Sequence, residues 1–251
     1  MVRCHQVSQH QIGLIVLSRF IHLLSGGAAQ GLVNALKDSI ENTTETQLIC
    51  SFGAVGLMKQ KLIDSAPCDV VILTAALIEQ LTASGHVLAG SARHLGPVKT
   101  GVAVKSGTPW PKVETAEQLK AALLVASAIY FPDPQLATAG IHFMKVLNGL
   151  GIAHTVAPKL RPFPNGNTAM NAMAACDDPN VIGCTQVTEI LITAGIDLVA
   201  NLPLEFELAT MYTAGVRSTS TCAAEAQAMI DILTSTENAA LRAKGGFLRM
   251  A

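Results

Sequence analysis

Charged residues are scarce in this chain of 251 residues: Asp, Glu, Lys and Arg make up 14% of it, against 50% hydrophobic residues. That balance argues against intrinsic disorder and supports a sizeable buried core. The formal net charge is -1, and no segment carries a stripe of Lys and Arg. Because nucleic acids are held mainly through basic surfaces, we expect no nucleic-acid partner.

Metal and redox motifs are also missing. The six cysteines form no C-x-x-C pair, and no cluster of Cys and His has the spacing of zinc ligands. Scattered thiols are typical of a reducing compartment, and thiols in apolar stretches are commonly buried. We therefore predict reduced thiols, no metal site and no cofactor.

Long apolar runs are absent as well. No stretch approaches the ~20 apolar residues of a membrane-spanning helix, so we expect no membrane span. The run 12–17 resembles a weak signal peptide, but Arg19 interrupts it, and cleavage near Ala28 would remove the first predicted strand. We therefore expect a soluble, cytoplasmic protein with residues 1–18 as an N-terminal extension. A true start site further upstream would instead indicate a periplasmic protein.

Short apolar runs alternate with helical patterns along most of the chain, which is typical of βαβ units on largely parallel sheets. The runs predict strands at 21–25, 48–52, 70–73, 101–104, 128–131, 181–185 and 198–200. The helical patterns lie near 30–40, 55–63, 76–83, 116–125, 138–147 and 168–175. After residue 203 comes a longer extended segment, and helices follow it near 223–233 and 237–243.

This order of elements predicts two lobes. We place the boundaries near Pro97 and Pro203, so that residues 19–97 and 204–251 form lobe 1 and residues 98–203 form an inserted lobe 2. The predicted fold class is α/β. Each lobe is expected to be a mostly parallel sheet flanked by helices.

Three strand-to-helix junctions share one design, in which small and hydroxyl residues open a helix. They contain S-G-G-A at 25–28, F-G-A-V-G at 52–56 and T-A-G at 138–140. Small residues let the backbone approach a ligand, and free N–H groups at helix N-termini attract anions. Each turn alone is also an ordinary helix cap. Together they predict an anion site beyond the carboxyl ends of the strands, and none has the glycine spacing of a nucleotide-binding loop.

Five sequence segments, called blocks below, occur in this order along the chain: S-G-G-A-A, F-G-A-V-G, C-D-V-V-I-L-T-A, F-P-D-P-x-x-A-T-A-G-I-H-F and I-G-C-T-Q-V-T-E-I. They resemble the molybdate-binding (ModA-like) group of type 2 periplasmic binding proteins over nearly the whole chain, from about residue 20. The resemblance implies the two-lobed substrate-binding fold of type 2 periplasmic binding proteins, with a small anionic ligand in a cleft between the lobes. With Thr74 added from its place at a strand end, the expected ligand-binding residues are Ser25, Gly26, Gly53, Ala54, Val55, Thr138, Ala139, Asn165, Asn167, Thr185 and Gln186.

Two positions depart from the pattern of that group. Molybdate binders of the group usually have a serine in the second turn, where this chain has Gly53 and Ala54, and a tyrosine near Thr185 and Gln186. The missing hydroxyls make molybdate a poorer match, and the Gln186 amide suits a carboxylate. Some relatives of the group are enzymes. Aconitate isomerase resembles molybdate-binding proteins and moves a proton across an allylic tricarboxylate, which requires a base but no cofactor.

Two functions therefore stay open. The one we favour on sequence is an intracellular aconitate isomerase-like enzyme acting on a small polycarboxylate. The alternative is a solute-binding protein for molybdate or another small anion, with an ABC permease as its partner.

Two residues are candidates for the base of such an enzyme. His142 lies on the first turns of the helix at the third junction, and Glu189 follows Thr185 and Gln186. Each also has an ordinary structural explanation. A histidine is often packed on the flank of a helix, and a glutamate near a helix start complements the helix dipole.

Overall fold

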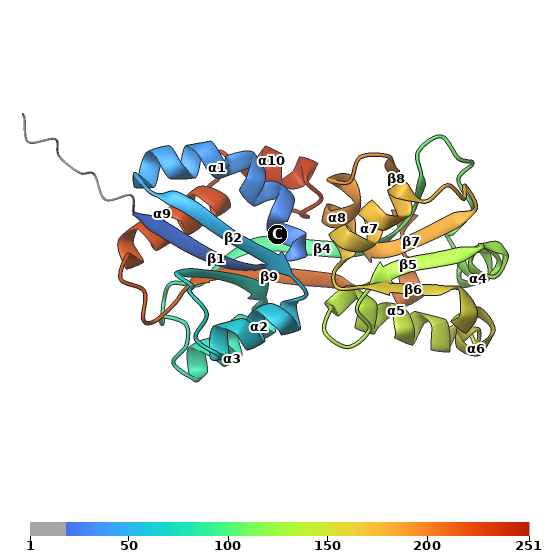
Figure 1. The fold of residues 1–251 in the computed structure, drawn as a ribbon, viewed down its shortest axis with the longest axis horizontal. Helices are drawn as coiled ribbons and strands as arrows, with labels where there is room; N and C mark the ends of the chain where they lie inside the picture. The colour runs from blue at the N-terminus through green and yellow to red at the C-terminus, as the bar shows by residue number, and fades with distance from the viewer. Residues whose placement is uncertain (1–18, 251) are drawn as a thin grey trace, which may run out of the picture.

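The computed structural model describes residues 19–250; the predicted extension, residues 1–18, lies outside them. Nine strands in this part form one sheet in the order β2-β1-β3-β9-β4-β7-β5-β6, with β8 beside β4. Figure 1 shows two halves side by side, with β4 and β9 running between them. The strands are β1 (Phe20–Gly26), β2 (Gln47–Gly53), β3 (Val70–Thr74), β4 (Arg93–Lys105), β5 (Ala128–Pro132), β6 (Leu160–Phe163), β7 (Val181–Gln186), β8 (Ile196–Asn201) and β9 (Ala209–Val216).

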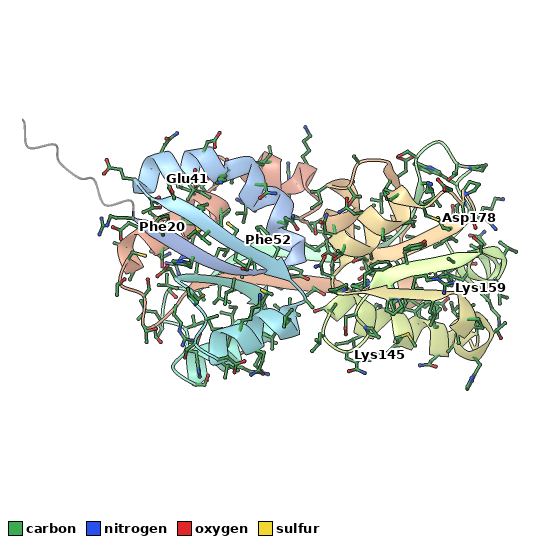
Figure 2. All side chains as sticks on the ribbon, in the orientation of Figure 1. Phe20, Glu41, Phe52, Lys145, Lys159 and Asp178 are labelled. Carbon is green, nitrogen blue, oxygen red and sulfur yellow. The ribbon has the colours of Figure 1, made fainter. Side chains whose placement is uncertain are left out.

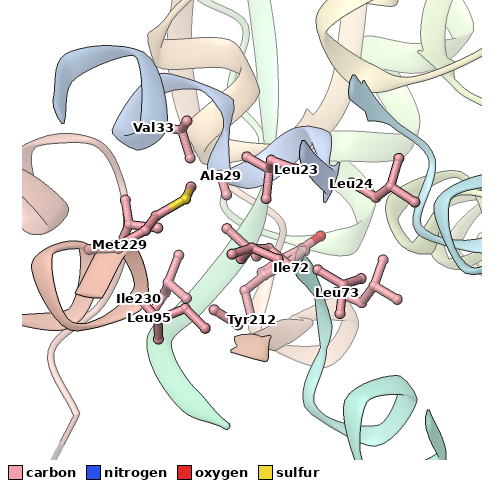
Figure 3. Packing of buried hydrophobic residues seen from close by; sticks show 14 of the residues in the cluster. Leu23, Leu24, Ala29, Val33, Ile72, Leu73, Leu95, Tyr212, Met229 and Ile230 are labelled. Carbon is pink, nitrogen blue, oxygen red and sulfur yellow. The ribbon is translucent and has the colours of Figure 1, made fainter. Parts of the chain in front are cut away.

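The half built on β1, β2, β3 and β9 is called the first half below. Its sheet lies between two groups of helices, as Figure 1 shows. One group contains α1 (Gln30–Thr44), α9 (Ala223–Thr234) and α10 (Ala239–Lys244), and the other contains α2 (Val55–Ile63) and α3 (Ala75–Ala83). Ile72 and Leu73 on β3 are fully buried between them, and Tyr212 on β9 packs in the same cluster (Figure 3).

The second half is built on β5, β6, β7 and β8, and each face of its sheet has its own core. One face packs against α4 (Ala116–Val125), α5 (Thr138–Gly149) and α6 (Ala153–Val156), with Phe131 and Phe143 at its centre. The other face packs against α7 (Gly166–Ala175) and α8 (Val187–Leu191), chiefly through Met170 and Met173. Charged side chains such as those of Lys145 and Asp178 lie on the outside (Figure 2).

The outer strands pair in parallel, as the sequence predicts: β1 with β2 and β3, and β5 with β6 and β7. The central strands β4 and β9 are antiparallel to all their neighbours, so the sheet is mixed. Strand β4 begins at Arg93, well before the predicted start at residue 101. Its first part is polar, and Gly96, with φ of 136°, lies at a shift in register. These features hide a strand in the sequence. Strand β6, with the sequence L-R-P-F, was also not predicted.

The two halves are joined near the first predicted lobe boundary. Strand β4 pairs with β9 as far as Lys99 and with β7 and β8 from Thr100 onward. The backbone N–H of Leu202 donates to the Thr100 carbonyl at 3.0 Å, and that of Thr100 donates to the Leu208 carbonyl at 3.2 Å. The chain therefore passes from the first half to the second near Thr100, and it returns to the first half beside the same point. The boundaries at Pro97 and Pro203 themselves stay predictions. Within residues 19–250, no helix is long and apolar enough to cross a membrane.

Asp69, directly before β3, joins three segments of the first half. Its Oδ2 accepts the backbone N–H of His22 at 2.9 Å, and its Oδ1 accepts the Ser220 hydroxyl at 2.7 Å. Burial alone would raise the pKa of this carboxyl, but these hydrogen bonds hold the pKa below its usual value. The charged form of Asp69 therefore stabilises the fold.

Replacing Asp69 with Asn is expected to lower the free energy of unfolding at pH 7 by about 1–3 kcal/mol, since the hydrogen bonds to a charged acceptor are weakened. Because the pKa of Asp69 is lower in the folded protein, its contribution is present above the unfolded pKa. It is lost as the pH falls through the folded value. Urea unfolding at pH 7 and at pH 3 measures this, with the exposed Asp64→Asn as control. An equal effect of both substitutions at pH 7 would contradict the role assigned to Asp69.

Candidate functional site

A small cavity of about 20 Å³ lies between the two halves. That is the room of roughly one water molecule, so an anion of several atoms requires the halves to lie slightly further apart. Both halves contribute to its wall, so the halves are closed on each other. The residues lining the cavity are Gly27, Ala28, Gly53, Ala54, Val55 and Tyr212 from the first half, and Pro132, Ala137, Thr138, Ala139, Asn165, Gly166, Gln186 and Glu189 from the second.

Several helix N-termini meet at this cavity. Helix α2 begins after Ala54 and helix α5 after Ala137, and neither cap residue has a side chain that satisfies the first N–H groups. The same holds for η1 (Gly27–Ala29), which leads into α1. The first N–H groups of a helix have no partner within it, and the helix dipole makes them attractive to anions. The cavity is thus surrounded by backbone donors from both halves.

The structure brings eight of the predicted site residues into the cavity wall: Gly53, Ala54, Val55, Thr138, Ala139, Asn165, Gln186 and Glu189. Thr74 instead lines a wider groove of about 600 Å³ beside the cavity, which Val55 and Thr138 also line. Ser25 and Gly26 lie behind the wall. The Ser25 hydroxyl is fully buried and donates to the Gly26 carbonyl at 2.8 Å.

Three other predicted residues lie outside the wall. Thr185 is fully buried, and its hydroxyl donates to Glu189 Oε2 at 2.6 Å, so it acts on the site through Glu189. The Asn167 carbonyl accepts the side-chain amide of Asn171 at 2.8 Å. His142 is directed away: its Nε2 lies 2.7 Å from the Phe206 carbonyl oxygen, a contact that fits a histidine packed on the flank of a helix.

Glu189 is the buried acid of the site, with 4% of its surface exposed. Its carboxylate lies between two glycines. A Cβ added at Gly27 would overlap Oε1, and one added at Gly166 would overlap Oε2. Burial raises the pKa of this carboxyl, and the Thr185 hydroxyl and the backbone N–H groups of Asn167 and Gly166 oppose the rise. The N-terminus of α7 is thus directed at a side chain of the protein itself.

Tyr212 is the main wall residue that sequence reasoning did not assign to the site. It lies on β9 and is 2% exposed, and its ring would be 3.3 Å from a Cβ at Gly26. Burial raises its pKa, and the nearby charge of Glu189 raises it further. No local pattern marks it, because β9 enters the site by returning from the second half. Gly27, Ala28, Pro132, Ala137 and Gly166 also line the cavity; the first four lie within the predicted turns and blocks, and Gly166 lies between Asn165 and Asn167, but none was among the expected ligand-binding residues.

The cavity wall contains no Lys, Arg or His; its titratable groups are Glu189 and Tyr212. Among residues 19–250, no group of three or more His, Cys, Asp or Glu is placed to hold a metal ion. An anion in this cavity would therefore be held by neutral donors, chiefly backbone N–H groups and the Thr138 hydroxyl.

The family model for bacterial extracellular solute-binding proteins matches residues 21–248. The chain belongs to this family. A curated relative, the aconitate isomerase of a Pseudomonas species, is 25% identical over 223 residues, which cover 86% of this chain and 83% of that protein. The similarity extends over most of both chains.

Solved structures of binding proteins share the fold. The periplasmic molybdate-binding protein of Azotobacter vinelandii has a TM-score of 0.76 at 16% identity, covering 92% of this chain and all (100%) of that one. The sulfate-binding protein SubI of Mycobacterium tuberculosis has a TM-score of 0.71 at 16% identity, covering 91% of this chain and 86% of that one. The predicted two-lobed periplasmic-binding-protein fold, and the resemblance to molybdate-binding proteins, are confirmed.

Proposed function

We propose that this member of the solute-binding family binds a small anion in the cavity between its halves. The observation that carries the proposal is the meeting of the uncapped N-termini of η1, α2 and α5 at one cavity whose wall has no basic side chain. Such a site favours a compact oxyanion or carboxylate, which can accept several backbone N–H groups at once. The similar proteins include a molybdate-binding protein, a sulfate-binding protein and an aconitate isomerase, and all three ligands are small anions.

Closure of the halves completes the proposed site. Donors come from both sides, and the Gly56 N–H on α2 donates across the cleft to the Leu136 carbonyl at 3.0 Å. Closing around an anion removes water, which strengthens each charge–dipole contact. If the protein acts in transport, we propose that it is exported and that its partner is an ABC permease. The cytoplasmic location expected from the sequence stays a prediction.

A panel of molybdate, sulfate, citrate, and cis- and trans-aconitate tests the proposal. At 100 times its dissociation constant, a ligand adds about 2.7 kcal/mol to the free energy of unfolding. That corresponds to a rise in melting temperature of roughly 5–10 °C for a chain of this size. Thr138→Val removes a hydroxyl from the cavity wall and should weaken binding about 5- to 10-fold, as measured by calorimetry. The exposed Thr155→Val is the matched control. The proposal fails if no anion of the panel binds.

A second candidate function is allylic proton transfer on a small polycarboxylate. Two observations favour it: the aconitate isomerase relative, and the placing of Glu189 in the cavity wall with a raised pKa. A base with a raised pKa accepts a proton more readily near neutral pH. In this reading Glu189 takes a proton from one carbon of the substrate and returns it to another. The sequence alone favours this enzyme. The family match and the structures of similar binding proteins favour binding instead.

A further inference from the structure

The carboxyl group of Glu189 occupies a position suited to a ligand anion. It lies at the N-terminus of α7, held by the Thr185 hydroxyl, and it touches Gly27 of the first half. A substitution for glycine at either Gly27 or Gly166 would overlap it. The sequence therefore keeps both neighbouring positions free of side chains, and the carboxyl group fills the space between them.

No positive charge balances this carboxyl group in the described structure. The groups of the first half that face the Glu189 carboxyl group are Gly27 on η1 and Tyr212 on β9. The pKa of the Tyr212 hydroxyl is raised, so Tyr212 is neutral here. From the second half, α7 offers Gly166 and Asn167, and β7 offers the Thr185 hydroxyl and the Gln186 backbone. When the Gln186 side-chain amide is oriented so that both its polar atoms have partners, its nitrogen donates to the Val98 and Lys99 carbonyls at 3.3 Å, which engages it with β4.

An anion in the cavity would thus meet an ionised Glu189 with no cation between them. In a site closed to water, two adjacent negative charges repel strongly, and groups so placed share a proton. The proton converts the contact from a repulsion into a charge-assisted hydrogen bond. Two carboxylates that share one proton are a familiar case of the same physics.

Resting on the proposed function, we propose that an anion binds in this cleft together with one proton, which is held between the anion and the carboxyl group of Glu189. With a fully ionised anion such as sulfate, the proton is on Glu189, and its O–H donates to the ligand. With an anion that carries its own hydroxyl proton, the ligand donates to the carboxylate. Glu189 is then a specificity-determining residue that couples affinity to pH.

The sign of the coupling follows from the proton balance. Where Glu189 of the free protein is ionised, binding a fully ionised anion takes up one proton. The affinity then falls up to tenfold for each unit of rise in pH. Where Glu189 is already protonated, at lower pH, the affinity does not vary. A permanently uncharged amide at this position removes the coupling.

Calorimetry with sulfate and with molybdate, between pH 5 and pH 10, tests this inference. Wild-type affinity is expected to fall by up to tenfold per pH unit in the upper part of the range. The heat of binding there should depend on the ionisation enthalpy of the buffer, as proton uptake requires. Glu189→Gln should bind with an affinity independent of pH, whereas the exposed Glu205→Gln should behave as wild type.

Infrared difference spectra give a direct second readout. In the pH range where the affinity falls, the spectrum of the wild-type complex with sulfate minus that of the free protein should show a new band of a protonated carboxyl group, and Glu189→Gln should show none. Binding without that band would overturn the inference and leave the proposed function standing. So would a pH dependence that persists in Glu189→Gln. If neither protein binds any anion, the proposed function fails and the inference falls with it.

Discussion

Replacing Gly27 with alanine is expected to weaken anion binding by roughly 5- to 150-fold. The added Cβ would overlap Oε1 of Glu189, which reaches Gly27 from the other half of the molecule. The carboxylate cannot retreat toward α7, because Gly166 already touches its second oxygen. Either the halves stay further apart, or Glu189 swings into the cavity of about 20 Å³. Both outcomes remove room and donors from the ligand.

The size of this effect follows from the cost of overpacking. Forcing extra methyl-sized groups into a packed site costs about 1–3 kcal/mol. At 1.4 kcal/mol per factor of ten, this corresponds to roughly 5- to 150-fold in affinity. Because opening the halves relieves the overlap, most of the cost should fall on the closed, ligand-bound form. The free energy of unfolding without ligand should change much less.

Calorimetry with the anion that binds most tightly in the panel measures the loss, and urea unfolding measures the stability of the unliganded protein. Gly245→Ala is a matched control, since a Cβ there meets its nearest neighbour at an ordinary 3.4 Å. The same Gly27→Ala change should cost far less in a Glu189→Ala background, where the overlapping carboxylate is gone. An equal cost in both backgrounds would contradict the contact between Gly27 and Glu189.

The turns of the site could be predicted from the sequence because they are local. Gly53, Ala54 and Val55 follow an apolar strand, and Thr138 and Ala139 open a helix, so position along the chain alone places them at the carboxyl ends of strands. Parallel βαβ units then bring such ends to one edge of the sheet. The same reasoning gave the fold class correctly, since it depends on the order of the elements.

The contacts between the halves could not be predicted in the same way. Gly27 and Glu189 are far apart in the sequence, and their contact depends on the angle between the halves. Tyr212 enters the site because β9 runs antiparallel to β3 and returns from the second half. That pairing departs from the parallel pattern on which the prediction rested. His142 had a favourable position along its helix, but the rotation of α5 turns the ring toward the Phe206 carbonyl.

Glycines lie at several of the contacts between the two halves. Gly27 meets Glu189, Gly31 meets Ile192, and Gly56 meets Leu136. At each place a glycine of the first half receives a larger residue of the second. At Gly27, which lines the cavity, the backbone thus comes close to the ligand position without a side chain in between. An anion site made of backbone donors requires this closeness, because each N–H must reach the ligand directly.

If the protein interconverts the isomers of aconitate, Glu189→Gln is expected to slow the reaction by about 100- to 10,000-fold, the usual contribution of a positioned base. Glutamine keeps the size of the side chain but cannot accept the proton. Proton NMR of cis- and trans-aconitate in D2O measures both interconversion and exchange of solvent deuterium. His142→Gln is the discriminating partner variant. Its ring lies outside the cavity wall and contacts the Phe206 carbonyl, so turnover should persist.

The pH dependence of this turnover shows whether Glu189 acts as the base or only contacts the substrate. A proton taken up with the substrate must leave Glu189 before the carboxylate can act as base. The rate at saturation should therefore rise with pH through the pKa of Glu189 in the complex, while the affinity for aconitate falls over the same range. Loss of turnover in His142→Gln, with Glu189→Gln still active, would show that His142 is the base instead. Unchanged spectra with the wild type would leave the cleft as a binding site alone.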